Sequence, residues 1–142
     1  MEILQPKGWK RPNGYSNGIK VDGDMIYVAG QVGWNDRNEI TSAGLVDQIL
    51  QALRNVASVL ETGSAKPKHI VRMTWYVTET EEYLSLQKEI GQAYRSVMGD
   101  HYPAMTVIEV AGLIEEGAKI EIEATAVIPS DRRGQVDAGI DD

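Results

Sequence analysis

The sequence predicts a single α+β domain in which two helices cover one face of a mixed β-sheet. Its 142 residues fit one domain, since domains commonly run to about 100–150 residues. Two segments with apolar residues at helical spacing alternate with strand-like segments, and 118–129 alternates apolar and polar residues with a period of two. The expected order is β-β-α-β-α-β-β over 1–129. The polar residues 130–142 are expected to form a disordered tail.

The N-terminal elements are expected to be an irregular arm followed by a β-hairpin. Residues 1–18 are rich in Gly, Pro and Asn, which is typical of irregular structure. Apolar residues then flank Asp22-Gly23, a dipeptide that tolerates the positive φ angles of tight hairpin turns. Gly30 ends the second strand, and a polar loop follows over 31–41.

Two amphipathic helices are predicted on either side of a central strand. The first covers about 43–60, where apolar residues recur at helical spacing. The strand 69–78 is dense in β-branched and aromatic residues. Thr78 or Thr80 is expected to cap the second helix, which Gly99 ends. The buried stripe of this helix is expected to be Tyr83, Leu86, Ile90, Tyr94 and Val97.

Two final strands are predicted at 104–112 and 118–129. In the second, Glu121 and Glu123 share the face opposite the apolar residues. If the two strands pair as a hairpin, Glu109 joins these carboxylates. Because both helices cover the same face of the sheet, the other face is left unburied in a monomer, which indicates oligomerisation. Residues expected on that face include Val107, Ala111 and Val127.

The composition favours an ordinary globular protein and excludes several classes. The net charge of −7 argues against nucleic-acid binding, which depends on basic residues that neutralise phosphates. The chain has no cysteine, so disulfides, thiolate catalysis and zinc–cysteine sites are excluded. No signal peptide or membrane-spanning run is present, and we therefore expect a cytoplasmic protein without membrane partners. His69 and His101 do not fall at ligand spacing, so neither a metal nor another cofactor is expected.

Paired carboxylates are the first candidate site. Glu121 and Glu123 lie about 7 Å apart on one strand face, where they could act as general bases or hold a metal ion. The alternative is a solvated or salt-bridged sheet face, with Lys119 as a partner. The second candidate is the loop that begins at Gly30, whose backbone N–H groups could bind an anion or a carbonyl oxygen. The alternative there is an ordinary strand-ending turn.

Aromatic residues form the third group of candidates. Tyr15 and Ser16 lie in the arm, but no serine-hydrolase pattern accompanies them. Trp34, Trp75 and Tyr102 could line a pocket, although large aromatic side chains more often pack in a core or an interface.

Six segments in the same order resemble the Rid (reactive intermediate deaminase) family, also called YjgF-type or endoribonuclease L-PSP, from about residue 12 to 129. The last two segments together are the most specific. The six segments are PNGYSNG, VAGQVG, DQILQALRN, VRMTWYVT, PAMTVIEVAGL and KIEIEATAVIP.

The resemblance implies a chorismate-mutase-like fold and a homotrimer whose sheets pack around a barrel-like centre. Small-molecule ligands then bind in clefts between subunits, where deaminating members hydrolyse 2-imino or enamine acids. By resemblance, Tyr15 closes the cleft, Gly30 offers its backbone to the substrate, and Glu121 positions or activates the attacking water. The other residues implied to line the cleft are Gln31, Ala104, Met105 and Thr106.

One position departs from the family pattern. Deaminating members carry an arginine after Pro-Ala that binds the substrate carboxylate, whereas this chain has Met105. Methionine has no hydrogen-bond donor and no charge, so standard imino-acid deamination is in doubt, and Arg72 is a candidate replacement. Three functions stay open: hydrolysis of a different imine or enamine, non-catalytic binding of a small molecule, and regulation as an interaction protein.

Overall fold

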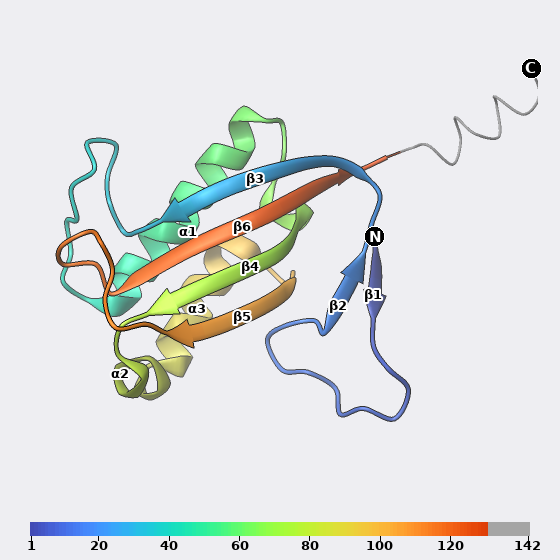
Figure 1. The fold of residues 1–142 in the computed structure, drawn as a ribbon, viewed down its shortest axis with the longest axis horizontal. Coiled ribbons are helices and arrows are strands. Elements are labelled where there is room, and N and C mark those ends of the chain that lie inside the picture. Colours follow the sequence, from blue (N-terminus) through green and yellow to red (C-terminus); the bar gives the residue numbers. More distant parts are fainter. Residues whose placement is uncertain (131–142) are drawn as a thin grey trace, which may run out of the picture.

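The computed structural model describes residues 1–130, so the predicted disordered tail lies, apart from Ser130, outside the described residues. The elements are β1 (Glu2–Leu4), β2 (Gly18–Lys20), β3 (Gly23–Gln31), α1 (Leu45–Thr62), a 3-10 helix (Pro67–His69), β4 (Ile70–Val77), α2 (Thr80–Ser85), α3 (Gln87–Met98), β5 (Ala104–Glu109) and β6 (Ile120–Pro129). They form a two-stranded sheet of β1 and β2 and a four-stranded sheet in the order β3-β6-β4-β5 (Figure 1).

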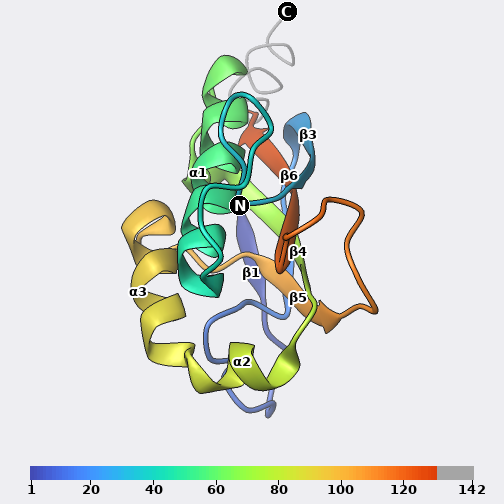
Figure 2. The ribbon, with the colours of Figure 1, turned by 90° about the vertical axis from the view of Figure 1, so that its left-hand side faces the viewer.

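The four-stranded sheet is mixed, as predicted. Strand β5 runs parallel to β4, whereas β6 is antiparallel to both β3 and β4. Neighbouring parallel strands need a crossover connection, and α2 and α3 supply it between β4 and β5. Figure 2 shows α1 and α3 on one side of the sheet. These features confirm the predicted α+β fold class.

The hairpin predicted at Asp22-Gly23 is wrong. Strand β2 pairs with β1 instead of β3, because the chain passes from one sheet to the other at Asp22-Gly23. Gly23 is needed there for a different reason from the one predicted: a Cβ atom would lie 2.0 Å from the carbonyl oxygen of Ile128 on β6. Strands β5 and β6 are likewise not neighbours, since β4 lies between them.

The core lies between the sheet and helices α1 and α3. On β6 the predicted alternation is confirmed, because Ile120 and Ile122 are fully buried while Glu121 and Glu123 are on the other face. Among residues 1–130, no helix is long and apolar enough to cross a membrane. The largest fully buried side chains include Ile49, Leu53, Leu60, Ile70, Met73, Trp75, Ile120 and Ile122.

The face of the four-stranded sheet that the helices leave uncovered is called the open face below. One residue predicted on this face is not there, because Val107 lies beside the buried Trp75 and packs against the core. Val127 is on the open face by its pairing with Met25, although it is only 3% exposed. By strand register, the open face carries Met25, Tyr27, Arg72, Thr74, Tyr76, Thr106, Ile108, Glu121, Glu123, Thr125 and Val127.

The second predicted helix is divided at Leu86 into α2 and α3, and its cap differs from the prediction. No threonine side chain caps it. Instead, the backbone N–H of Thr80 donates to Oε1 of Glu109, at 2.9 Å. Glu109 therefore serves the N-terminus of α2 and does not join Glu121 and Glu123. The hydrogen bond from the Thr80 backbone lowers the pKa of the Glu109 carboxyl from its ordinary value.

This contact gives the first testable prediction. Because the folded state lowers the pKa of Glu109, its contribution to stability is present above the ordinary pKa of 4.5 and is lost as the pH falls through the folded value. The Glu109→Gln variant is therefore expected to lose less thermal stability than the wild type between pH 7 and pH 3. Melting temperatures measured across this range test it, with Glu116→Gln as the control. A Glu109→Gln profile parallel to that of the wild type would contradict the assignment.

Candidate functional site

A cleft of about 720 Å³ lies between the N-terminal arm, helices α2 and α3, and strand β5. We call it the arm cleft. It contains Met105 and Tyr15, two of the residues predicted to form a site, and it also contains Trp75 and Tyr102. Further residues that line it are Arg11, Tyr83, Gln87, Gly91, Arg95 and Val107.

The arm is fixed over the cleft by Ser16. Its hydroxyl donates to the carbonyl oxygen of Tyr102 at 2.6 Å, and its backbone N–H donates to that of Pro103 at 3.0 Å. Ser16 also forms a parallel bridge with Ala104, at the start of β5. The role of Ser16 is thus to anchor the arm, which holds Tyr15 at the wall of the cleft.

Aromatic side chains form much of the cleft wall. The rings of Tyr94 and Tyr102 are stacked with centroids 5.5 Å apart, and Tyr94 lies 6.2 Å from Trp75. Burial raises the pKa of the Tyr83 and Tyr94 phenols, so both are protonated and uncharged at neutral pH. Trp34 is not part of this wall. Its indole N–H instead donates to Gln31, at 3.4 Å.

Glu121 and Gly30, two other predicted site residues, lie side by side on the open face. A Cβ atom at Gly30 would lie only 2.5 Å from Oε2 of Glu121. The glycine therefore provides the space that the carboxylate occupies. In the part of the chain that the structure describes, no hydrogen bond or ion pair engages the Glu121 side chain. Its carboxylate is thus free to bind a water molecule or a ligand.

Glu123 differs from Glu121 because it already has a protein partner. The Tyr76 hydroxyl donates to its Oε1 at 2.6 Å, and this hydrogen bond raises the pKa of Tyr76. Lys119, the predicted partner of these carboxylates, is instead 3.2 Å from Glu82. Among the described residues, no group of three or more His, Cys, Asp or Glu side chains is placed to hold a metal ion.

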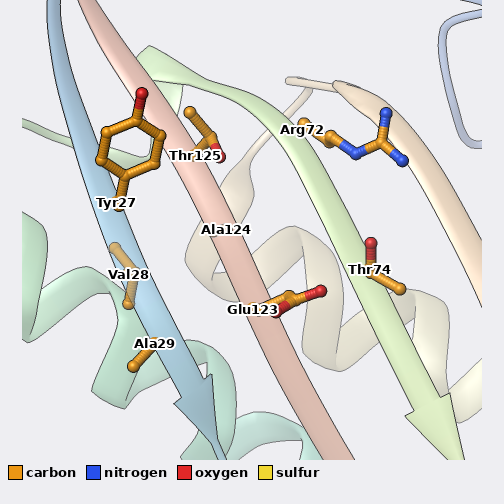
Figure 3. Close-up of a pocket in the computed structure, with 8 residues that line it drawn as sticks. All are labelled: Tyr27, Val28, Ala29, Arg72, Thr74, Glu123, Ala124 and Thr125. Carbon is orange, nitrogen blue, oxygen red and sulfur yellow. The ribbon is translucent and has the colours of Figure 1, made fainter.

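A second cleft, of about 460 Å³, lies on the open face around Arg72 (Figure 3). Arg72 is paired with Ala104 and therefore shares its face of the sheet, whereas Met105 is paired with the buried Met73. The proposed replacement of the missing cation by Arg72 is thus not supported within one subunit, because successive residues of β5 point to opposite faces. Thr106 is on the open face too, opposite Thr74.

The same alternation separates the two residues on which the predicted site was centred. Met105 is on the helix side of β5, and Glu121 is on the open face of β6, with β4 between the two strands. One subunit therefore contains two separate groups of predicted residues: Tyr15 and Met105 in the arm cleft, and Gly30 and Glu121 on the open face.

Two arginines of the arm cleft were not found by sequence reasoning. Arg11 lies in the arm, and Arg95 is near the end of α3. Each looks like an ordinary surface charge in the sequence. The one available signal was Gly91, a glycine in the interior of a helix and one turn before Arg95, because glycine is unfavourable there without a structural reason.

These features define a small α+β domain with a mixed sheet, helices on one face and a cleft at the edge strand. The sequence profile described as Endoribonuclease L-PSP matches residues 9–128. The chain belongs to the Rid family, also known as the YjgF or endoribonuclease L-PSP family.

Individual relatives agree with this assignment. The RutC family protein of Aquifex aeolicus is 30% identical over 128 residues, which are 89% of this chain and 98% of the relative. The 2-iminobutanoate/2-iminopropanoate deaminase of Escherichia coli is 31% identical over 116 residues, 80% of this chain and 86% of that enzyme. The crystal structure of YyfB from Yersinia pestis, a Rid family protein described as of unknown function, has a TM-score of 0.78 and 30% identity. The two structures match over 89% of this chain and 98% of the YyfB chain.

Proposed function

We propose that this protein is a homotrimeric hydrolase of a reactive imine or enamine, with its active sites in clefts between subunits. The observation that carries the proposal is the free Glu121 carboxylate, held beside Gly30 on a sheet face that no helix covers. A relative 31% identical to this chain is named as a deaminase of 2-iminobutanoate and 2-iminopropanoate. This name supports an imine or enamine as the class of substrate.

The open face supports the trimer. Its exposed apolar side chains include Tyr27 and Met25, which are 72% and 55% exposed, and Ile108, which is 48% exposed. Exposed apolar surface on this scale commonly marks an interface. In the proposed assembly, Glu121 and Gly30 of one subunit face the arm cleft of the next. This arrangement brings together the two groups of residues that lie apart in one subunit.

The chemistry requires one positioned water and one proton acceptor. The water oxygen attacks the imine carbon while Glu121 accepts a proton from the water, and the imine nitrogen takes up a proton. The C–N bond of the resulting carbinolamine then breaks as Glu121 returns its proton to the amine nitrogen and the hydroxyl group loses its proton to solvent, which releases ammonia and leaves a carbonyl group. Positioning of the water and substrate lowers the barrier, and the carboxylate adds general-base assistance. Tyr15 closes the cleft over the substrate.

Met105 is expected to change the substrate rather than the reaction. Without a cation at this position, a small 2-imino acid loses a charge-assisted interaction, which is typically worth about 1.5–3 kcal/mol. The corresponding loss of affinity is about ten- to a hundredfold. Methionine instead offers a flexible apolar surface, which suits a substrate with an apolar group.

The Met105→Arg variant tests this part of the proposal. We expect it to hydrolyse 2-iminopropanoate about ten- to a hundredfold faster than the wild type, because the guanidinium would bind the substrate carboxylate. The substrate is generated in situ by a dehydratase, and ammonia release is followed. Met105→Leu is the control, since it changes the side chain without adding charge. Wild-type activity equal to that of an arginine-bearing relative would show that Met105 does not limit the reaction.

A second function, binding of a small molecule without catalysis, is favoured by Met105 alone. A protein that had lost the carboxylate-binding group could retain the cleft for an apolar ligand. Glu121 distinguishes the two functions, because an unpaired carboxylate is costly to bury in a binding site that does not use it. We therefore place the hydrolase first. A role as an RNA-directed regulator is disfavoured by the net charge of −7.

A further inference from the structure

We propose that Arg95 binds a carboxylate in the arm cleft, and that the ligand is a 2-imino acid with an aromatic or other large apolar side chain. The identity of the ligand as an imine rests on the function proposed above. The binding of a bulky carboxylate does not, because it follows from the charge, shape and hydrogen-bonding groups of the cleft itself.

The charge of the arm cleft differs from that of the whole chain. The protein has 21 acidic and 14 basic residues, yet among residues 1–130 the side chains that line the cleft include Arg11 and Arg95 and no aspartate or glutamate. A cleft whose charged groups are all cationic favours an anionic ligand. Arg11 is on the arm, whereas Arg95 is on the helix α3 that forms a fixed wall.

Gly91 gives Arg95 its position. A Cβ atom at Gly91 would lie 3.1 Å from a terminal guanidinium nitrogen of Arg95, so the side chain lies back over the glycine one turn earlier in α3. Glycine inside a helix costs about 1 kcal/mol relative to alanine. Among the described residues the guanidinium has no carboxylate partner, since the ion pair present joins Lys119 and Glu82. Its hydrogen-bond donors are therefore available to a ligand.

Trp75 provides a second sign of a missing acceptor. The indole ring forms part of the cleft wall, and its N–H is buried with no hydrogen-bond partner among residues 1–130. A buried donor without an acceptor is uncommon in folded proteins and needs an explanation. An oxygen atom of a ligand that reached this donor would satisfy it. Such a ligand must carry an acceptor, as a carboxylate does.

The size and walls of the cleft define the rest of the ligand. A volume of about 720 Å³ lies in the range of sites for drug-sized ligands, about 300–1,000 Å³, and exceeds what a three- or four-carbon acid fills. The walls present Met105, Val107 and the rings of Tyr83 and Tyr102. Aromatic and thioether side chains pack well against an aromatic group. A bulky apolar side chain attached to a carboxylate therefore matches the whole cleft.

Binding of three stable probes to the full-length protein tests the inference without catalysis. Calorimetry with 3-phenylpropanoate, 3-phenylpropanamide and propanoate separates the contribution of the carboxylate from that of the ring. We expect 3-phenylpropanoate to bind most tightly. Arg95→Gln should weaken its binding about ten- to a hundredfold and leave 3-phenylpropanamide unaffected. Arg54→Gln, which removes an exposed arginine of α1 outside the cleft, is the matched control.

Gly91→Ala provides an independent variant. The added methyl group would lie 3.1 Å from a guanidinium nitrogen of Arg95 and so shift this flexible group slightly. Gly91→Ala should therefore weaken binding of 3-phenylpropanoate less than Arg95→Gln does, while alanine raises the melting temperature through its higher helix propensity. A result in which the amide binds as tightly as the acid, or in which Arg95→Gln binds like the wild type, overturns the inference. Absence of imine hydrolysis with intact binding would instead reject the proposed function and leave the carboxylate site standing.

Discussion

Replacing Glu121 by glutamine is expected to slow imine hydrolysis by about a hundredfold to ten-thousandfold, the usual contribution of a general base. Glutamine has almost the same shape but cannot accept the proton of the attacking water. The Glu121 carboxylate has no partner among the described residues, so its replacement should leave the melting temperature nearly unchanged. Measurement of kcat and KM separately should show a loss in kcat.

Two further variants define what this result means. Glu123→Gln is the matched control, because Glu123 is on the same strand but is already hydrogen-bonded to Tyr76. It should retain activity. Gly30→Ala should lower activity while leaving the Glu121 carboxylate chemically intact. The Cβ atom of the new alanine would lie 2.5 Å from Oε2 of Glu121 and would therefore displace the carboxylate. Full activity of Glu121→Gln would remove Glu121 from the mechanism.

Replacing Ile122 by alanine is expected to lower the free energy of unfolding by about 2–5 kcal/mol, as large-to-small changes in a tightly packed core do. Ile122 is 0% exposed and belongs to β6, which pairs with both β3 and β4. Truncation leaves a cavity beneath α1, which packs on this strand. Urea denaturation at a fixed protein concentration measures the effect, because the stability of the proposed trimer would depend on concentration.

The control for this prediction is the same substitution in a different environment. Ile114→Ala removes an isoleucine side chain that is 104% exposed, in the loop between β5 and β6. It should change the free energy of unfolding by less than about 0.5 kcal/mol. Equal effects of the two substitutions would mean that burial of Ile122 by the helices does not determine the stability of the sheet.

The sequence predicted the elements well because their signals are local. The alternation along β6 and the helical spacing along α1 each depend on residues within a single element, and both were confirmed. Strand pairing was predicted poorly because it depends on distant parts of the chain. Asp22-Gly23 has the composition of a hairpin turn, but the close approach of β6 decides its conformation.

The candidate site shows the same limit. The alternation of apolar and polar residues along a strand predicts which residues share a face of the sheet. It does not predict which other strand lies next to that strand. Met105 and Glu121 were therefore expected in one wall, although they are on opposite faces of the sheet. Arg95 was missed because its position depends on Gly91 and on the aromatic side chains of the cleft, and an arginine near the end of an amphipathic helix is usually solvated.

The central claim is that each active site combines Glu121 of one subunit with the arm cleft of another, and co-expression of two inactive variants tests it most directly. Glu121→Gln removes the base, and Met105→Glu places a negative charge in the arm cleft. Neither alone should hydrolyse the imine. If the two variants are made in equal amounts and assemble at random, about a quarter of all clefts would combine two intact halves, so activity should return to about that fraction of the wild-type rate. Mixed trimers as inactive as either variant would contradict the account.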